Sequence, residues 1–242
     1  MSAAVQLTKP AAIFFDLDGT LIDSAPDLGA AADKMRRDRG LPSLPDALYR
    51  PMAGAGARGM LKVAFGMGTD HADFLTYREE FFANYEASIG AKDARTFAFE
   101  GVEAMLRGIE QSALLWGIVT NKSKRFTDPL VAHMQELRGA CAVVSGDTTP
   151  HAKPHPAPLR EACRLANLGL ASQSVHGLQA ITPAQCWYLG DDKRDIDAGR
   201  DAGMTTIAVT WGYEGEHGLA TWGADYVLDQ PLQLLQLFAS SA

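Results

Sequence analysis

The chain has 242 residues, 47% of them hydrophobic, and a formal net charge of −7 at pH 7. This length and apolar content suit one large domain, or a domain with a sizeable insertion, around a real core. The negative charge argues against nucleic acid or an anionic membrane as a partner, because both require a basic face. It still allows an anionic small substrate, because a bound cation can invert the local field.

The pattern of the chain also indicates its surroundings. No apolar run reaches the length that spans a membrane, and no signal-peptide pattern stands at the N-terminus. The three cysteines lie far apart, which favours reduced thiols over a disulfide or a zinc site. We therefore expect a soluble, cytoplasmic protein.

The first predicted element is a short buried strand at Ala12–Phe15, which ends abruptly in Asp16-Leu-Asp18-Gly-Thr. Carboxylates are almost never fully buried without a partner, so packing alone does not explain the two aspartates. A carboxylate pair at the end of a buried strand indicates a metal and proton-transfer site.

The next segment, from about Ser24 to Arg95, has helical spacing and no convincing strand. Ser24 is expected to cap a first helix, with Asp27 as the acid of a capping box. The glycine-rich stretch Pro51–Gly59 is expected to be a flexible turn. We expect residues 23–95 to form a helical insertion, and residues 1–22 and 96–242 to form the core.

Beyond the insertion, continuous apolar runs alternate with amphipathic segments. We expect strands at Leu114–Val119, Ala142–Val144, Trp187–Leu189, Thr206–Thr210 and Tyr226–Leu228, and helices at Val102–Gln111, Pro156–Ala166, Asp195–Ala202 and Leu232–Phe238. Continuous apolar strands are typical of sheets covered on both faces, and their alternation with helices predicts an α/β, Rossmann-like doubly wound parallel sheet. The polar stretch 171–183 exceeds the usual loop length and is expected to be a surface insertion without assigned function.

Polar clusters follow four of the predicted strands. After Asp16 and Asp18 come Thr120-Asn121, then Lys153-Pro154, and finally Gly190-Asp-Asp-Lys-Arg-Asp195. A parallel sheet brings the carboxyl ends of its strands to one edge, where ligands bind. We therefore expect several carboxylates, one ammonium and one hydroxyl group to share a site.

This set of carboxylates, ammonium and hydroxyl group suits phosphoryl transfer. Clustered carboxylates repel one another unless a hard cation binds them, and Mg²⁺ is the natural choice. The cation and Lys153 can neutralise phosphoryl oxygens, and Thr120 can donate a hydrogen bond to them. One aspartate of the first pair can attack phosphorus, while the other protonates the leaving oxygen and later activates water.

These four clusters resemble, in order, the motifs of the haloacid dehalogenase superfamily. The helical insertion after Asp23-Ser24 is similar to the small cap of its phosphoglycolate phosphatase branch. The resemblance implies that Asp16 is the nucleophile and a Mg²⁺ ligand, and that Asp18 is the acid/base, with its backbone carbonyl on the metal. The resemblance implies that Asp191 is the third protein ligand of the metal. It also implies that Thr120, Asn121 and Lys153 contact the phosphate. Asp192 or Asp195 would then orient a metal-bound water or Lys153. Asp195 also suits a helix N-terminus, a role compatible with that one.

The resemblance implies a phosphatase for a small phosphorylated metabolite. One interpretation is a phosphoglycolate phosphatase-like enzyme. Leu114–Lys122 and Trp222–Asp225 are also similar to the N-acetylmuramic acid 6-phosphate phosphatases. A sugar phosphomutase, which shares the motifs and cap type, and a non-enzymatic binding protein on an inactive scaffold are further alternatives. Arg58 is a candidate contact for a substrate carboxylate, because a guanidinium binds such a group through two hydrogen bonds.

Overall fold

The core of the molecule is a parallel β-sheet. The computed structural model describes residues 8–172, 180–213 and 218–238. Six strands pair in the order β5-β4-β1-β6-β7-β8, and every neighbouring pair is parallel. They are β1 (Ala12–Phe15), β4 (Leu115–Val119), β5 (Val143–Val144), β6 (Cys186–Gly190), β7 (Thr205–Val209) and β8 (Tyr226–Leu228). The predicted α/β Rossmann-like sheet is confirmed, with β1 at its centre between β4 and β6.

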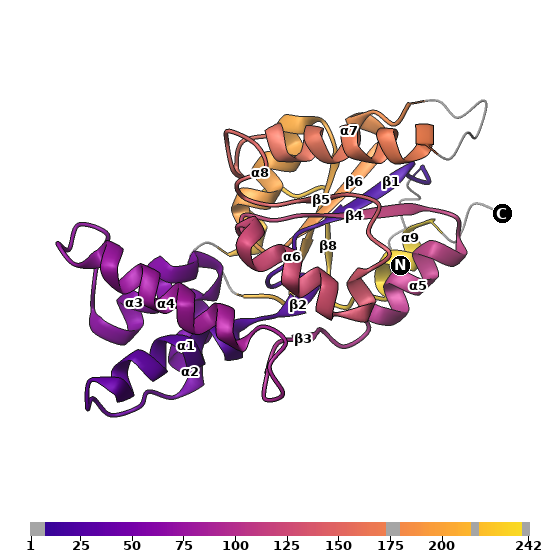
Figure 1. Cartoon of the computed structure of the whole chain (residues 1–242). Helices are drawn as coiled ribbons and strands as arrows, with labels where there is room; N and C mark the ends of the chain where they lie inside the picture. The colour runs from indigo at the N-terminus through magenta and orange to yellow at the C-terminus, as the bar shows by residue number, and fades with distance from the viewer. Residues whose placement is uncertain (1–7, 173–179, 214–217, 239–242) are drawn as a thin grey trace.

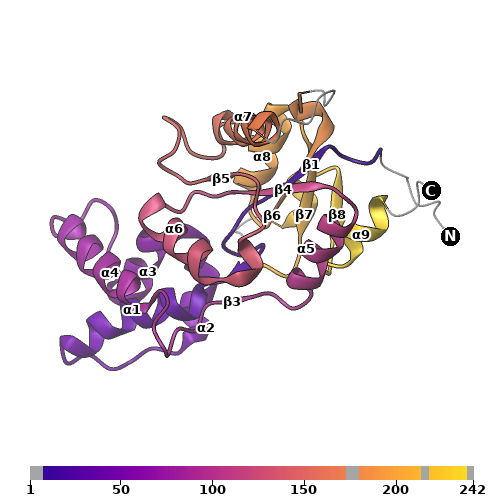
Figure 2. The same ribbon diagram turned by 45° about the vertical axis from the view of Figure 1, so that its right-hand side comes forward.

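Helices cover both faces of the sheet (Figure 1). Those of the sheet domain are α5 (Val102–Gln111), α6 (Lys124–His133), α7 (Ala157–Ser172), α8 (Lys193–Ala202) and α9 (Gln233–Phe238). Figures 1 and 2 show α7 and α8 on one face and α5 and α9 on the other. Successive side chains of β1 therefore enter different cores: Ala12 and Phe14 pack with α7 and α8, whereas Ile13 and Phe15 pack with α5 and α9. This two-sided burial explains why the strand is apolar throughout.

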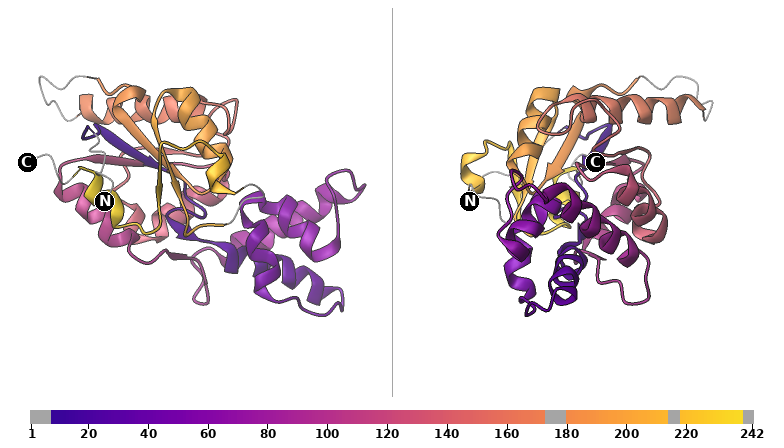
Figure 3. Two further views of the ribbon diagram at one scale, coloured as in Figure 1. Left: turned by 180° about the vertical axis from the view of Figure 1, so that it is seen from behind. Right: turned by 60° about the vertical axis from the view of Figure 1, so that its left-hand side comes forward.

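The segment between β1 and α5 forms a separate helical group. It contains α1 (Ala25–Asp38), α2 (Asp46–Tyr49), a 3₁₀ turn (Arg50–Ala55), α3 (Gly56–Phe65) and α4 (Phe74–Ser88). Figure 3 shows these helices set to one side of the sheet. They have their own apolar cluster, centred on fully buried side chains such as Met35, Tyr49 and Phe81, and Phe126 and Tyr213 of the sheet domain join it. The helical group is therefore packed both internally and against the sheet domain.

Two short antiparallel strands, β2 (Ile22–Asp23) and β3 (Phe97–Ala98), carry the chain into and out of the helical group. We did not predict this ribbon, because two residues are too few to show a strand pattern. The capping box expected at α1 is wrong. The Tyr213 hydroxyl accepts the backbone N–H groups of Ser24 and Ala25, and Asp27 instead accepts hydrogen bonds from Arg95 and Thr96 beside β3.

The structure differs from three other local expectations. The stretch expected to be a flexible turn is helical, since Arg50–Ala55 forms a 3₁₀ turn and α3 begins at Gly56. Helix α7 continues to Ser172 rather than Ala166, and Pro183–Gln185 forms another 3₁₀ turn. Residues 173–179 of the polar stretch 171–183 lie outside the described residues. Within the described ranges, no helix is both long and apolar enough to span a membrane.

Candidate active site

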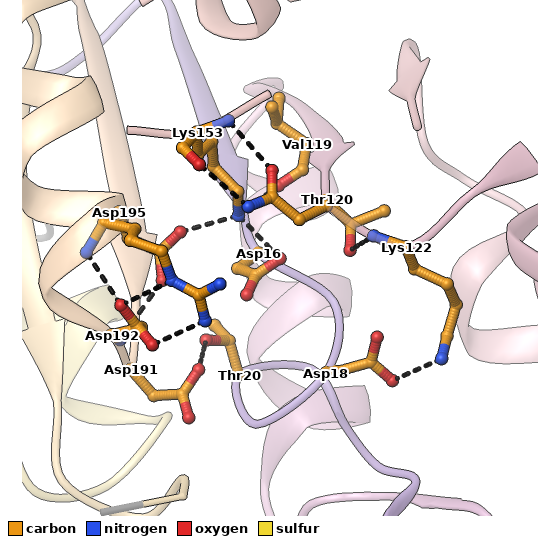
Figure 4. Close-up of polar contacts among 12 residues, drawn as sticks. Asp16, Asp18, Thr20, Val119, Thr120, Lys122, Lys153, Asp191, Asp192 and Asp195 are labelled. Carbon is orange, nitrogen blue, oxygen red and sulfur yellow. Dashed lines mark hydrogen bonds and ion pairs between the residues drawn. The ribbon is translucent and has the colours of Figure 1, made fainter. Parts of the chain in front are cut away.

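The predicted polar residues meet at the carboxyl edge of the sheet (Figure 4). Asp16 directly follows β1, Asp191 follows β6, and Thr120 follows β4. Lys153 comes from the loop after β5. These positions are adjacent because β1 lies between β4 and β6 and their ends are in register. The backbone N–H of Asp16 donates to Leu189 O at 2.8 Å, which continues the pairing of β1 with β6 up to the site.

Lys153 is the buried cation of this site. Its Nζ donates to Val119 O at 3.0 Å, to Tyr188 Oη at 2.8 Å and to Asp195 Oδ1 at 2.6 Å, and it also lies 2.8 Å from Asp16 Oδ1. Burial opposes the charged form, but the negative charges of Asp16 and Asp195 outweigh burial and raise the pKa of Lys153 above its usual value. Lys153 is therefore held as an ammonium among carboxylates.

Three carboxylates crowd the same point. One oxygen each from Asp16, Asp191 and Asp195 lies within 4.8 Å of the others. Burial raises the pKa of Asp16 from 3.8 to about 7, with Lys153 opposing the shift and Asp195 adding to it. The pKa of Asp191 is raised well above its usual value by burial and by the charges of Asp16 and Asp195. Asp16 Oδ1 is buried, and the Lys153 ammonium lies 2.8 Å from it. Three carboxylates gathered with one ammonium carry an excess of negative charge, and such a cluster suits a hard divalent cation.

Asp191 is oriented from two sides. Thr20 Oγ1 donates to Asp191 Oδ1 at 3.2 Å, and the backbone N–H of Tyr213 donates to Oδ2 at 2.8 Å. The turn that brings Thr20 here requires Gly19, whose φ is +88° and where an added Cβ would lie 2.1 Å from Asp191 Oδ2. The glycine of the Asp-Leu-Asp-Gly-Thr run therefore makes room for the third carboxylate.

Asp18 points away from this cluster, toward Lys122 (Figure 4). Its Oδ1 lies 3.1 Å from Lys122 Nζ and accepts a hydrogen bond from Ser24 Oγ. Burial opposes the charged form of Lys122, but Asp18 and Tyr85 outweigh burial and raise the pKa of Lys122. Two carboxylates that are near neighbours in the sequence thus occupy different environments.

The two residues after β4 differ in their contacts. The Thr120 hydroxyl oxygen accepts the backbone N–H of Lys122 at 3.1 Å, which leaves its own hydrogen for another acceptor. Asn121 holds the Lys153 loop: its Nδ2 donates to Lys153 O and its Oδ1 accepts the Lys153 backbone N–H, both at 2.9 Å. Asn121 was expected at the phosphate, but its amide is engaged at both ends by this loop.

The structure also separates Asp192 from Asp195. Asp192 caps α8 by accepting the backbone N–H of Arg194 at 2.8 Å, and it pairs with the Arg194 guanidinium at 2.7 Å. Asp195 accepts the Asp192 backbone N–H at 3.2 Å and contacts Lys153. Of the two candidates for orienting Lys153, only Asp195 touches it, while it also supports the helix start.

A cavity of about 860 Å³ opens above these residues. The helical group contributes the 3₁₀ turn, Arg58 and Tyr85 to its lining, and the sheet domain contributes the carboxylate cluster and Lys153. Arg58 is exposed on the first turn of α3, and no ion pair within the described ranges involves it. Contacts across the cavity join the two parts, because Arg194 Nη2 donates to Gly54 O at 2.9 Å and Lys122 Nζ donates to Tyr85 Oη at 3.0 Å.

Several residues of this site were absent from our sequence predictions. Lys122 follows Thr120-Asn121 directly, so its place at a strand end was a usable signal. Tyr188 lies inside β6, and Tyr85 and Tyr213 come from a helix and a loop far away in the sequence. Only the folded chain brings these tyrosines to the site.

The fold and site together define a class of protein: α/β proteins that gather carboxylates and a lysine at the carboxyl edge of a parallel sheet. A sequence model described as haloacid dehalogenase-like hydrolase matches residues 13–209. The chain belongs to this family, as the four motifs led us to expect.

Similar proteins carry phosphatase names. An N-acetylmuramic acid 6-phosphate phosphatase of Pseudomonas putida is 38% identical over 231 residues, covering 95% of this chain and 96% of that protein. A phosphoglycolate phosphatase of Xanthomonas campestris is 40% identical over 226 residues, covering 93% of this chain and 95% of that one. The crystal structure of a predicted phosphoglycolate phosphatase from Haemophilus somnus has the same fold, with a TM-score of 0.77 at 24% identity over 96% of this chain and 99% of the other. The expectation of a phosphatase of this family is therefore confirmed.

Proposed function

We propose that this protein is a Mg²⁺-dependent phosphatase that hydrolyses a small acidic phosphomonoester through an aspartyl-phosphate on Asp16. The observation that carries the proposal is the cluster of Asp16, Asp191 and Asp195, with the Lys153 ammonium in contact with two of the three carboxylates. Such a site concentrates positive charge, once a cation is bound, next to an oxygen nucleophile.

The residues suited to hold Mg²⁺ are Asp16, Asp191 and the backbone carbonyl of Asp18. When bound, the cation neutralises charge on the carboxylates and on the phosphoryl oxygens of the substrate. Asp195 reaches the same point, but its Oδ1 is engaged by Lys153. We therefore assign Asp195 to orienting Lys153, and Asp192 to the start of α8 and to Arg194.

The side chains divide the reaction among them. Lys153 and the hydroxyl of Thr120 bind phosphoryl oxygens, and Asn121 supports them by fixing the Lys153 loop. A carboxylate oxygen of Asp16 attacks phosphorus while Asp18 gives a proton to the leaving alcohol oxygen. Asp18 then takes a proton from a water molecule, which attacks the aspartyl-phosphate and releases inorganic phosphate.

The residues that select the substrate lie outside the cluster that carries out phosphoryl transfer. We propose that residues 23–95 act as a cap, because their helices line the cavity opposite the carboxylates. Arg58 is the cap cation suited to pair with a substrate carboxylate. A phosphoglycolate-like substrate offers such a group, in line with the name of the Xanthomonas campestris relative.

A second candidate substrate is N-acetylmuramic acid 6-phosphate, named for the Pseudomonas putida relative. The cavity volume of about 860 Å³ favours this candidate. Pockets of this size enclose ligands as large as a substituted sugar rather than a two-carbon acid. Both candidates carry a carboxylate, so the role of Arg58 is the same for each.

The deciding experiment compares kcat/KM, with Mg²⁺ present, for phosphoglycolate, N-acetylmuramic acid 6-phosphate and N-acetylglucosamine 6-phosphate. The last compound is a matched control that lacks the carboxylate-bearing ether group. We expect a clear preference for an acidic substrate. Equal turnover of the neutral control would contradict carboxylate recognition, and conversion of a sugar phosphate without steady phosphate release would indicate a mutase. Absence of metal-dependent phosphate release from any compound would instead favour a binding protein.

A further inference from the structure

Lys122 joins the acid/base residue to the cap. Its Nζ lies 3.1 Å from Asp18 Oδ1, 3.0 Å from Tyr85 Oη and 4.7 Å from the centre of the Tyr85 ring. The Lys122 side chain is only 8% exposed. A buried ammonium needs partners for its hydrogens, and here they come from two different parts of the molecule.

The backbone of Lys122 is fixed on the sheet side. Its N–H donates to Thr120 Oγ1 at 3.1 Å, and its carbonyl accepts from the Gly146 N–H at 2.8 Å and from Thr127 Oγ1 at 3.2 Å. The ammonium therefore extends from a strand end whose backbone is held by hydrogen bonds, so it can orient a neighbouring side chain.

Asp18 is that neighbour. Its carboxylate is outside the Asp16, Asp191 and Asp195 cluster and receives no contact from Lys153. Its Oδ1 is held by Lys122 and by Ser24, the residue that precedes α1. The orientation of Asp18 thus depends on these two contacts.

The partner on the cap is Tyr85, a buried residue of α4. Lys122 donates a hydrogen bond to its hydroxyl and also faces its ring, an interaction that strengthens when water is excluded. Displacement of α4 would remove both contacts and expose the ammonium to water.

We propose that Lys122 is a positioning residue that orients the Asp18 carboxyl group for proton transfer while α4 covers the site. The inference rests on the proposed phosphatase function. In the first step a bond forms between Asp16 and phosphorus, and the bond from phosphorus to the leaving oxygen breaks. That oxygen keeps the electron pair and takes the Asp18 proton. The Asp18 carboxylate so formed is paired with Lys122, so its negative charge arises next to a fixed cation.

Leaving-group chemistry tests this role. An alkyl phosphate needs its leaving oxygen protonated, whereas p-nitrophenyl phosphate releases a stable phenolate without that help. We expect Lys122→Met, which keeps the length of the side chain, to lower kcat for the better acidic substrate by about 10- to 100-fold, as for loss of an orienting contact. The burst of p-nitrophenolate, which reports the first step before Asp18 activates water, should slow by less than about threefold, because that step does not need proton donation.

Further variants keep the test decisive. Lys122→Arg should recover part of the lost rate, and Tyr85→Phe should lower kcat for the acidic substrate severalfold with the same selectivity. In an Asp18→Asn background, Lys122→Met should add little, because the group that it orients is gone. Lys124→Met is the matched control, since Lys124 is an exposed lysine of the same segment.

Two outcomes would overturn the inference. Equal slowing of the first step on both substrates, with a raised KM, would make Lys122 a substrate-binding residue, and unchanged kinetics would leave it without a role in turnover. Thermal melting of each variant identifies any that fails to fold, in which case Lys122→Arg and Tyr85→Phe decide. A wild-type protein inactive on both substrates would refute the phosphatase proposal itself, whereas an active wild type with unaffected variants refutes this inference alone.

Discussion

The Nζ of Lys153 lies 2.8 Å from Asp16 Oδ1, and the same ammonium donates hydrogen bonds to Val119 O, Tyr188 Oη and Asp195 Oδ1. The ammonium therefore shares its charge between two carboxylates. In the proposed mechanism it lies beside the nucleophile and also binds the phosphoryl oxygens.

Asp16→Asn should reduce turnover to background, because a neutral amide cannot form the aspartyl-phosphate. The variant should fold, and without metal it should melt at a higher temperature than the wild type. The reason is that ionised Asp16 is unfavourable in its buried cluster, as its raised pKa shows. Phosphate release and thermal melting measure the two effects. Asp70→Asn, at an exposed loop aspartate, is the control. Activity near that of the wild type would mean that another group attacks phosphorus.

Asp191→Ala and Lys153→Met should separate metal binding from phosphate stabilisation. Loss of Asp191 should raise the Mg²⁺ concentration for half-maximal activity by at least about tenfold, since one protein ligand is removed. Lys153→Met should lower kcat by about 10²-fold or more, in the range found for losing one transition-state contact. Its Mg²⁺ requirement should stay nearly unchanged. Mg²⁺ titrations of both variants check this, and superimposable curves would refute the division of roles.

Metal removal should make stability depend on pH. The Asp16 pKa rises from 3.8 to about 7 on folding, and that of Asp191 also rises. An acid with a raised folded-state pKa holds its proton in the folded state while the unfolded state ionises, so the free energy of unfolding falls as pH rises from about 4 to about 7. Chemical denaturation in chelator should show this loss, and saturating Mg²⁺ should flatten it. A metal-free protein whose stability rises through this window would contradict the carboxylate cluster.

Arg58→Ala should erode the preference for acidic substrates. We expect kcat/KM for the acidic compound to fall by about 10- to 150-fold, corresponding to a lost charge-assisted hydrogen bond of about 1.5–3 kcal/mol. Turnover of N-acetylglucosamine 6-phosphate should hardly change. Arg37→Ala, at an exposed arginine of α1, is the control on the same helical group. A parallel loss on the neutral compound would assign Arg58 to the phosphate or to cap stability instead.

Much of the site was predictable because its residues stand at strand ends. Asp16, Thr120 and Asp191 each directly follow an apolar run, and any parallel pairing of those runs brings them to one edge. The roles of Asn121 and Asp192 were harder to predict, because a polar residue after a strand can face a ligand or a neighbouring loop. Only side-chain contacts distinguish the two cases, and here both residues hold loops or helix starts.

The layered α/β fold, the helical insertion and the chemical groups of the site could all be predicted from the sequence, because apolar periodicity and motif order are local properties of the chain. The pairing of those groups could be established only from the folded chain. Lys153 pairs with Asp195 rather than with Asp192, and the Asp18 carboxylate pairs with Lys122. The Tyr213 hydroxyl, from a distant loop, accepts a backbone N–H at the start of α1. Such pairings depend on distances between segments far apart in the sequence, and only the packing of the folded chain sets those distances.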